Sequence, residues 1–175
     1  MTHTGSELQY KSRLGSTSIK VPVIGTGTNR WAYGENDEAI FQTYRALLDK
    51  GFNFFDTAEI YTGGKSERLL GECYRKDSRP AIIASKYRPS NSRRTKKDFT
   101  EALNGSLNRL GTDIIDLYYV HMPPSAQSIE DLMDNMVEAL AANMIRAVGV
   151  SNFDAEQMSR ASERLEMHGF KLAAN

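Results

Sequence analysis

Short apolar runs alternate with helix-like segments along nearly the whole chain, with a new run about every 30 residues, the length that one strand, one helix and two loops need. Between the runs, apolar residues recur three or four positions apart, as on one face of a helix. Strict alternation of this kind is typical of a parallel sheet with helices outside it. The predicted strands are Val21–Gly27, Phe52–Asp56, Ala81–Lys86, Ile114–His121, Ile145–Val150 and Lys171–Asn175.

The predicted helices carry recognisable start and stop signals. The second is expected to start at Ser66, with Glu67 in its first turn, where an acid suits the helix dipole. Ser128 and Asp154 are expected to cap the fourth and fifth helices. Gly111 should end the third helix, because glycine readily takes the left-handed conformation that follows many helices.

The N-terminal part is expected to precede the repeating units. Residues 1–7 are predicted to form a disordered tail and residues 8–20 a β-hairpin that turns near Gly15. We expect a single domain over residues 1–175, with βα units from residue 21 onward. Both a (β/α)8 barrel and an open doubly wound sheet fit the alternation. Gly25 and Gly27 match the first two glycines of a dinucleotide fingerprint, but Arg30 replaces the third, which weakens the open sheet.

Composition argues against several classes of function. The chain has 22 basic and 22 acidic residues, so it lacks the basic excess typical of nucleic-acid partners. No apolar run is long enough for a membrane span, and the polar N-terminus lacks a signal region. We therefore expect a cytoplasmic protein, with an organelle stroma as the alternative. Cys73 is the single cysteine and the three histidines are scattered, so no metal site is predicted.

Polar residues stand at the carboxyl ends of the predicted strands, where parallel α/β proteins carry their chemistry. Alone, each has an ordinary alternative: an acid that caps a turn, a tyrosine in a core, a surface lysine or a structural histidine. The residues are Asp56 and Tyr61 after the second strand, Lys86 after the third, His121 after the fourth, and Ser151 and Asn152 after the fifth.

The stretches that hold these residues resemble the aldo-keto reductase family. They are FNFFDTAEIYTGGKSERLLGE, ASKY, DIIDLYYVHMP and IRAVGVSNF, and the resemblance runs from Gly25 to Asn175. It implies a (β/α)8 TIM-type barrel with the hairpin at its bottom. Such a barrel usually needs roughly 250 residues. We therefore expect an incomplete barrel of about five and a half βα units, in a fragment or a truncated relative.

The resemblance also implies an activity, the reduction of an aldehyde or ketone to an alcohol with NADPH. Tyr61 would donate a proton to the carbonyl oxygen, and Lys86 would favour that step, because an ammonium beside a phenol stabilises the phenolate. Asp56 would hold the lysine in place. His121 would orient the carbonyl by a hydrogen bond.

Cofactor contacts are implied for five residues. Ser151 and Asn152 would hydrogen-bond the nicotinamide carboxamide, with a cap for the following helix as their alternative role. Gly27 and Thr28 would let backbone approach the cofactor, and Asp56 would also lie beside it. Further contacts in the family lie beyond the position of the last residue here, so the choice of NADPH rests on the resemblance.

Other interpretations stay open at this point. Trp31 is a candidate wall of the substrate pocket, although it stands later than the tryptophan of many relatives. The basic run from Lys86 to Lys97 fits either a phosphate site or a solvated loop and helix start. The alternative function is a regulatory NADP-binding protein, such as a channel-associated subunit, or an inactive fragment. Such a chain could associate with itself through the open sector of the barrel.

Overall fold

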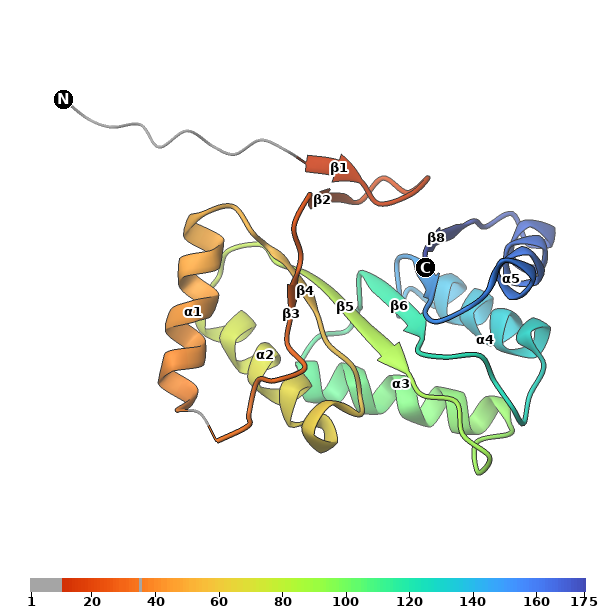
Figure 1. Ribbon diagram of the computed structural model, residues 1–175, viewed down its shortest axis with the longest axis horizontal. Coiled ribbons are helices and arrows are strands. Elements are labelled where there is room, and N and C mark those ends of the chain that lie inside the picture. Colours follow the sequence, from red (N-terminus) through yellow and green to blue (C-terminus); the bar gives the residue numbers. More distant parts are fainter. Residues whose placement is uncertain (1–10, 35) are drawn as a thin grey trace.

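The structure is a computed structural model that describes residues 11–34 and 36–175 (Figure 1). Within these residues, β1 (Lys11–Arg13) and β2 (Lys20–Pro22) form a two-stranded antiparallel sheet. A second sheet is parallel and six-stranded, with the strand order β3-β4-β5-β6-β7-β8. The predicted tail and the first residues of the predicted hairpin lie outside the described residues.

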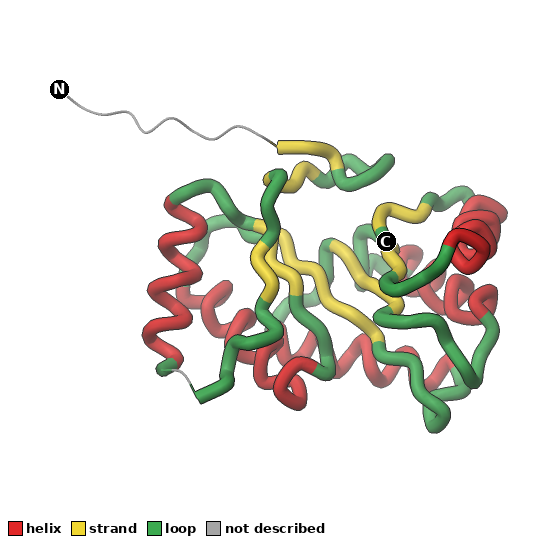
Figure 2. Tube along the Cα trace, viewed as in Figure 1, coloured by secondary structure: helices red, strands yellow, loops and turns green. Residues whose placement is uncertain are grey.

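Strands and helices alternate along the rest of the chain (Figure 2). Each strand pairs with the next one in the sequence, with no point at which the order reverses, which is the arrangement of a barrel rather than of a doubly wound sheet. The strands are β3 (Thr26–Gly27), β4 (Phe54–Asp56), β5 (Ile82–Tyr87), β6 (Leu117–Val120), β7 (Val148–Val150) and β8 (Leu172–Ala174). The helices are α1 (Asp37–Asp49), α2 (Lys65–Lys76), α3 (Lys96–Leu110), α4 (Ile129–Ala141) and α5 (Ala155–Met167), with a short 3₁₀ helix η1 (Tyr61–Gly64) before α2.

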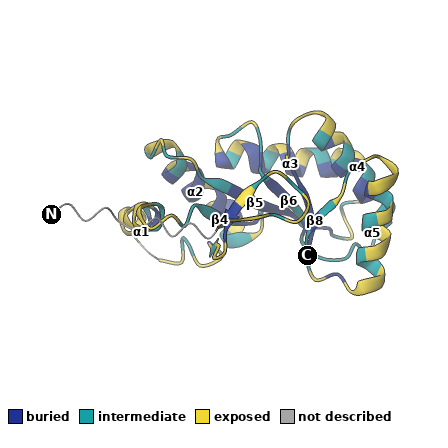
Figure 3. Cartoon of the chain, turned by 90° about the horizontal axis from the view of Figure 1, so that it is seen from above, coloured by how far each residue is buried: buried dark blue, intermediate teal, exposed yellow. Residues whose placement is uncertain are grey.

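The helices follow one another in an arc along the strands, with buried residues facing the sheet and exposed residues outside (Figure 3). Successive side chains of a strand point to opposite faces, so each strand contributes to two cores. Phe55, Ile83 and Tyr118 belong to the large cluster that includes the helices. Their neighbours Ala84 and Leu117 belong to a smaller cluster on the other face. We call these the helix-facing core and the inner cluster.

The hairpin of β1 and β2 lies across the amino-terminal ends of the parallel strands (Figure 1). Leu14 and Ile19 of its turn pack against the inner cluster. Gly15 has a positive φ of 53°, and a Cβ atom there would lie 2.5 Å from the carbonyl oxygen of Ala173. Only glycine therefore allows the turn to approach β8 this closely. The hairpin occupies the place expected for the closure of a barrel's bottom.

The first predicted strand, Val21–Gly27, is wrong as a single element. The hairpin takes its first part, since β2 pairs with β1 and ends at Pro22, which has no N–H to donate to a ladder. Val23 and Ile24 follow in an exposed connection, with 67% and 59% of their surface accessible. Only Thr26–Gly27 joins the parallel sheet.

Other strands are present but shorter than predicted, and β5 is shifted by one residue. Phe52 is not part of β4, because its N–H donates to the carbonyl of Leu47 and closes the end of α1 beyond Gly51. In the predicted strand Ile114–His121, the first residues form only an isolated bridge, between Ile115 and Ile145. Backbone groups used by helix ends and loops are thus withdrawn from the ladders.

Several helix ends agree with the sequence. Thr95 and Asp154 form reciprocal capping boxes with the residues three positions later, and Gly111 ends α3 in the left-handed conformation. Ser128 accepts a hydrogen bond from the backbone N–H of Asp131, which caps α4. The predicted start at Ser66 is wrong, because α2 begins one residue earlier, after Gly64, and has no side-chain cap.

Candidate active site

Four of the predicted site residues meet at the carboxyl ends of β4, β5 and β6. Asp56 and Lys86 each stand two positions after an inward-facing residue, so their side chains share the inner face of the sheet. The register pairs Lys86 with Tyr119, which places His121 just beyond the same end. Tyr61 opens η1, directly after the loop that leaves β4.

Lys86 is the centre of this group, and only 6% of the residue is exposed. Its ammonium donates hydrogen bonds to a carboxylate oxygen of Asp56, to the carbonyl of Thr57 at 2.8 Å and to the phenolic oxygen of Tyr61 at 3.2 Å. A buried ammonium needs such partners to offset its lost hydration. The alternative of a surface lysine is therefore wrong.

His121 completes the group from the β6 side. Its ring meets the ring of Tyr61 edge-on, with centroids 5.7 Å apart. Burial, helped by the charges of Lys86 and Arg88 and opposed by Glu59, lowers the pKa of His121 to about 4. The imidazole is therefore uncharged at neutral pH. Its Nδ1 atom is buried and has no hydrogen-bond partner among the described residues.

A network of buried hydroxyls lies behind the lysine and was not predicted. Thr28, Thr57 and Ser66 are each fully buried. The Ser66 hydroxyl donates to the carbonyl of Thr28 at 2.9 Å and lies 2.8 Å and 3.0 Å from the Thr28 and Thr57 hydroxyls. The Thr28 hydroxyl also donates to the carbonyl of Asp56 at 3.0 Å. This network joins β3, β4 and α2 beneath Asp56 and Lys86.

The network gives Thr28 and Ser66 structural contacts that the sequence did not predict. Thr28, a candidate for cofactor contact, is fully buried within this network, and its contact with a cofactor stays a prediction. Ser66, predicted as the start of the second helix, donates a hydrogen bond to the carbonyl of Thr28 beyond the end of β3. The sequence signal was a hydroxyl residue next to each strand end and one in the following helix turn, but the pattern does not reveal that they meet.

The remaining cofactor candidates lie at the ends of β3 and β7. Gly27 is exposed, and a Cβ atom placed on it would meet no atom within 4 Å. Asn152 takes a positive φ of 62°, and its side-chain amide donates to the carbonyl of His121 at 3.0 Å and to the Ser151 hydroxyl at 3.1 Å. Asp154 caps α5, so the alternative that Ser151 and Asn152 serve as its cap is wrong.

Trp31 and the basic run contribute in different ways. The Trp31 ring lies 6.2 Å from that of Phe55 and packs against the helix-facing core, and its carbonyl accepts a hydrogen bond from Thr62. In the basic run, Arg94, Lys96 and Lys97 are exposed, as a solvated loop and helix start would be, whereas Arg93 is only half-exposed and donates to the carboxylate of Glu59 at 2.5 Å.

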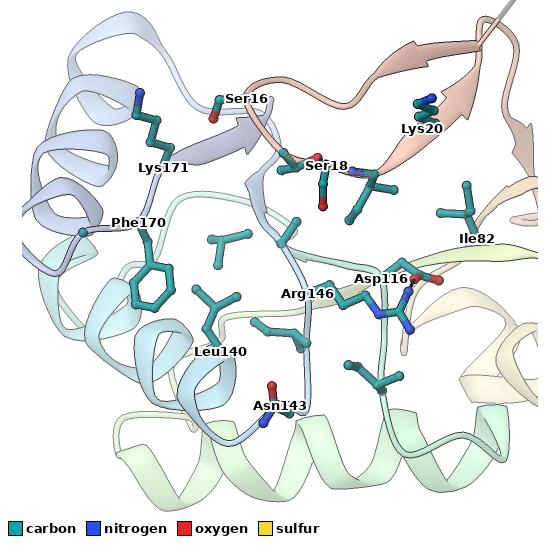
Figure 4. A pocket seen from close by; sticks show the side chains of 17 residues that line it. Ser16, Ser18, Lys20, Ile82, Asp116, Leu140, Asn143, Arg146, Phe170 and Lys171 are labelled. Atoms are coloured by element: carbon teal, nitrogen blue, oxygen red, sulfur yellow. Dashed lines mark hydrogen bonds and ion pairs between the residues drawn. The ribbon is translucent and has the colours of Figure 1, made fainter.

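A cavity of about 780 Å³ lies at the opposite, amino-terminal ends of the strands, below the hairpin (Figure 4). Ser18 and Lys20 of the hairpin, Ile82 and Phe170 line part of it. Arg146 and Asp116 form an ion pair there at 3.1 Å. Because parallel α/β barrels build their active sites at the carboxyl ends of the strands, we place the candidate site at the Lys86 group and not in this cavity.

Two further searches cover the described part of the chain. Among residues 11–34 and 36–175, no group of three or more histidine, cysteine, aspartate or glutamate side chains is placed to hold a metal ion. Within the same residues, none of the helices combines the length and the apolar character that crossing a membrane requires.

The fold and this arrangement define an α/β protein of the barrel type with a Tyr–Lys–Asp–His group at its strand ends. The chain belongs to the aldo/keto reductase family, whose model matches residues 23–175. The six parallel strands form an incomplete (β/α)8 barrel of that family.

Individual comparisons agree with the family. The chain is 36% identical over 169 residues to aldo-keto reductase YhdN of Bacillus subtilis, covering 86% of this chain and 49% of the relative. It is 29% identical to a probable voltage-gated potassium channel subunit beta of Oryza sativa subsp. japonica, covering 93% and 53%. An aldo-keto reductase from Klebsiella pneumoniae in complex with NADPH matches with a TM-score of 0.76 and 32% identity, covering 89% and 54%. The chain thus spans about half the length of the curated relatives it matches.

Proposed function

We propose that this chain carries the proton-donating site of an NADPH-dependent reductase that converts an aldehyde or ketone to an alcohol. The observation that carries the proposal is the contact of 3.2 Å between the Tyr61 phenol and the Lys86 ammonium, which Asp56 also binds. Membership of the aldo/keto reductase family supports the reaction class.

The site residues divide the work of proton transfer. Reduction of a carbonyl builds negative charge on its oxygen, and Tyr61 donates its phenolic proton there, forming the O–H bond of the alcohol. The phenolate left behind is stabilised by the Lys86 ammonium, which Asp56 and the Thr57 carbonyl hold in place. His121, uncharged at neutral pH, orients the carbonyl oxygen through a ring N–H.

The residues present fit the nicotinamide end of the cofactor. The Ser151 hydroxyl accepts from Asn152, which leaves its own O–H free to donate to a carboxamide oxygen. Gly27 offers exposed backbone with open space in front of it, and Asp56 lies beside it in the sheet. When bound, NADPH would supply the hydride that reduces the carbonyl carbon.

A second candidate function is a regulatory NADP-binding protein without fast turnover. The specific observation in its favour is the similarity to the rice protein named as a probable potassium channel subunit beta. Both functions would retain NADPH binding. They differ in whether bound NADPH is oxidised when a carbonyl compound is added.

The test combines NADPH binding, followed by fluorescence, with NADPH oxidation by a panel of aldehydes and ketones. For a reductase, Tyr61→Phe should lower kcat by roughly 10²–10⁴-fold, the range of general acid catalysis, while the affinity for NADPH stays the same. Tyr33→Phe is the matched control, because Tyr33 is 65% exposed and outside the site. A Tyr61→Phe variant that keeps more than about a tenth of the activity would contradict the assignment. Tight NADPH binding without oxidation would favour the regulatory function.

A further inference from the structure

We propose that Glu59 and Arg93 are positioning residues that fix the Tyr61 phenol relative to the Lys86 ammonium. The inference rests on the proposed function and extends it to two residues outside the Tyr–Lys–Asp–His group. It also gives a role to the basic run after β5, for which sequence analysis left a phosphate site and a solvated loop as alternatives.

Glu59 connects the loop of Tyr61 with the strand end of Lys86. It precedes Tyr61 by two residues, and its backbone N–H donates to the Lys86 carbonyl at 3.4 Å. Its carboxylate accepts a hydrogen bond from the backbone N–H of Arg88 at 2.6 Å. Glu59 therefore holds the chain both at Lys86 and two residues beyond it. Glu59 thereby fixes the position of the loop that carries the Tyr61 phenol relative to the strand end that carries the Lys86 ammonium.

Arg93 holds the Glu59 carboxylate in that position. Its two terminal nitrogens donate to the two carboxylate oxygens at 2.5 and 3.0 Å, and one of them also donates to the Arg88 carbonyl at 3.0 Å. Only 6% of the Glu59 side chain is exposed, so the charge depends on this partner. The paired geometry restricts the carboxylate in direction as well as in distance.

The same unit reaches the loop that follows His121. The side-chain amide of Gln127 donates to the Arg93 carbonyl at 2.9 Å, and the Ser125 hydroxyl lies 2.8 Å from the side-chain oxygen of Asn91. The loops after β4, β5 and β6 are therefore joined around one ion pair. In contrast, the two-pronged pair between Arg160 and Glu130 joins α5 to the first turn of α4 and makes no hydrogen bond to Glu59 or Arg93.

The test observes Tyr61 directly, without requiring turnover. The protein is labelled with fluorotyrosine, and the Tyr61 signal among its eight tyrosines is assigned by fluorine NMR through its loss in Tyr61→Phe. Lys86→Met defines the signal of Tyr61 without its lysine. Arg93→Lys keeps the positive charge but loses the paired hydrogen bonds that the guanidinium makes to the carboxylate. We expect the Tyr61 signal in Glu59→Gln and in Arg93→Lys to move towards its position in Lys86→Met. Glu130→Gln and Arg160→Lys change the ion pair between α4 and α5 in the same two ways. They are the matched controls and should leave the Tyr61 signal unchanged.

Steady-state kinetics add a second readout. Glu59→Gln and Arg93→Lys should lower kcat on the order of 10–100-fold with unchanged NADPH affinity, because misplaced reacting groups slow the chemical step and not cofactor binding. If the unaltered protein shows no turnover, the proposed function fails while the NMR comparison still decides the positioning role. If Glu59→Gln does not fold by circular dichroism, Arg93→Lys decides it. An unmoved Tyr61 signal in folded Arg93→Lys, or an equal shift in the controls, would overturn the inference.

Discussion

His121 gives the site a dependence on pH that can be measured at the level of one residue. In the unfolded chain a histidine has a pKa of about 6.5, whereas burial lowers the pKa of His121 to about 4 in the fold. Above pH 6.5 the ring is uncharged in both states. As pH falls towards 4, the unfolded chain binds the proton first, so the folded state loses stability.

We therefore expect the free energy of unfolding to fall between pH 7 and pH 5 by on the order of 1 kcal/mol from this residue, after allowing for solvent screening. Urea unfolding at both pH values measures it. His121→Gln cannot titrate, so the loss should be smaller in that variant by this amount. Equal pH dependence of the two proteins would show that His121 has an ordinary pKa in the fold.

The family resemblance, together with the positions of the residues after parallel strands, predicted which four side chains meet, because parallel strands bring their carboxyl ends together. The supporting residues could not be predicted in this way. Arg93 belongs to a segment rich in charge, which sequence patterns assign to solvent, and no pattern around Glu59 indicates that its charge is buried. The burial of the Glu59 side chain and its pairing with Arg93 follow from the packing of three loops that are distant in the sequence.

At the scale of elements, a buried ion pair connects α2, α3 and β5. The Glu67 side chain is fully buried, and its carboxylate accepts from the Ser85 hydroxyl at 2.6 Å and from Arg109 at 2.6 Å. Sequence analysis assigned Glu67 to the helix dipole. The structure shows instead that it links two helices to β5, the strand that carries Lys86.

Loss of one partner should therefore be costly. We expect Arg109→Met to lower the free energy of unfolding by about 3–5 kcal/mol, because it leaves a buried carboxylate without its counter-charge. Arg160→Met, at an exposed pair, should cost no more than about 1 kcal/mol. Denaturant unfolding measures both. If the buried charge is the cause, adding Glu67→Gln to Arg109→Met should restore part of the stability; no gain would contradict this explanation.

The order and type of most elements followed from the alternation of apolar runs, and cap residues marked several helix ends, whereas the ends of the strands could not be predicted. The run of apolar residues around Pro22 shows why. It continues from Val21 to Ile24 in the sequence, but the structure assigns its first part to the hairpin strand β2 and its second part to a connection. Phe52 is apolar like its neighbours, yet its N–H serves the end of α1. The periodicity of apolar residues indicates which side chains are buried. It does not indicate which backbone N–H and C=O groups remain free to pair with a neighbouring strand.

At the scale of the whole molecule, we propose that the described chain associates with itself through the edge strands of its parallel sheet. β3 and β8 each have a neighbouring strand on one side only. Val23 and Ile24 next to β3 are exposed. Unpaired strand edges beside apolar side chains favour pairing with another chain.

Sedimentation velocity over a range of concentrations tests this proposal. We expect a weight-average mass that rises with concentration, and a reduced rise in Ile24→Lys, because a charge at the edge opposes strand pairing. Met167→Lys is the matched control, since Met167 is 74% exposed but lies at the end of α5. A monomer at every concentration would contradict the proposal, as would an equal effect of both lysines.

The two sides of the parallel strands constrain genetic change in different ways. In β5, Lys86 faces the inner side, whereas Ser85 and Tyr87 face the helices. A point substitution on the inner side alters the chemistry and leaves the other core untouched. Deleting one residue from the strand would move the side chains that follow it to the opposite face of the sheet. The Lys86 ammonium would then be buried among apolar side chains, and Tyr87 would point into the site. The barrel can therefore evolve by replacing residues at these positions, while insertions and deletions are confined to its loops.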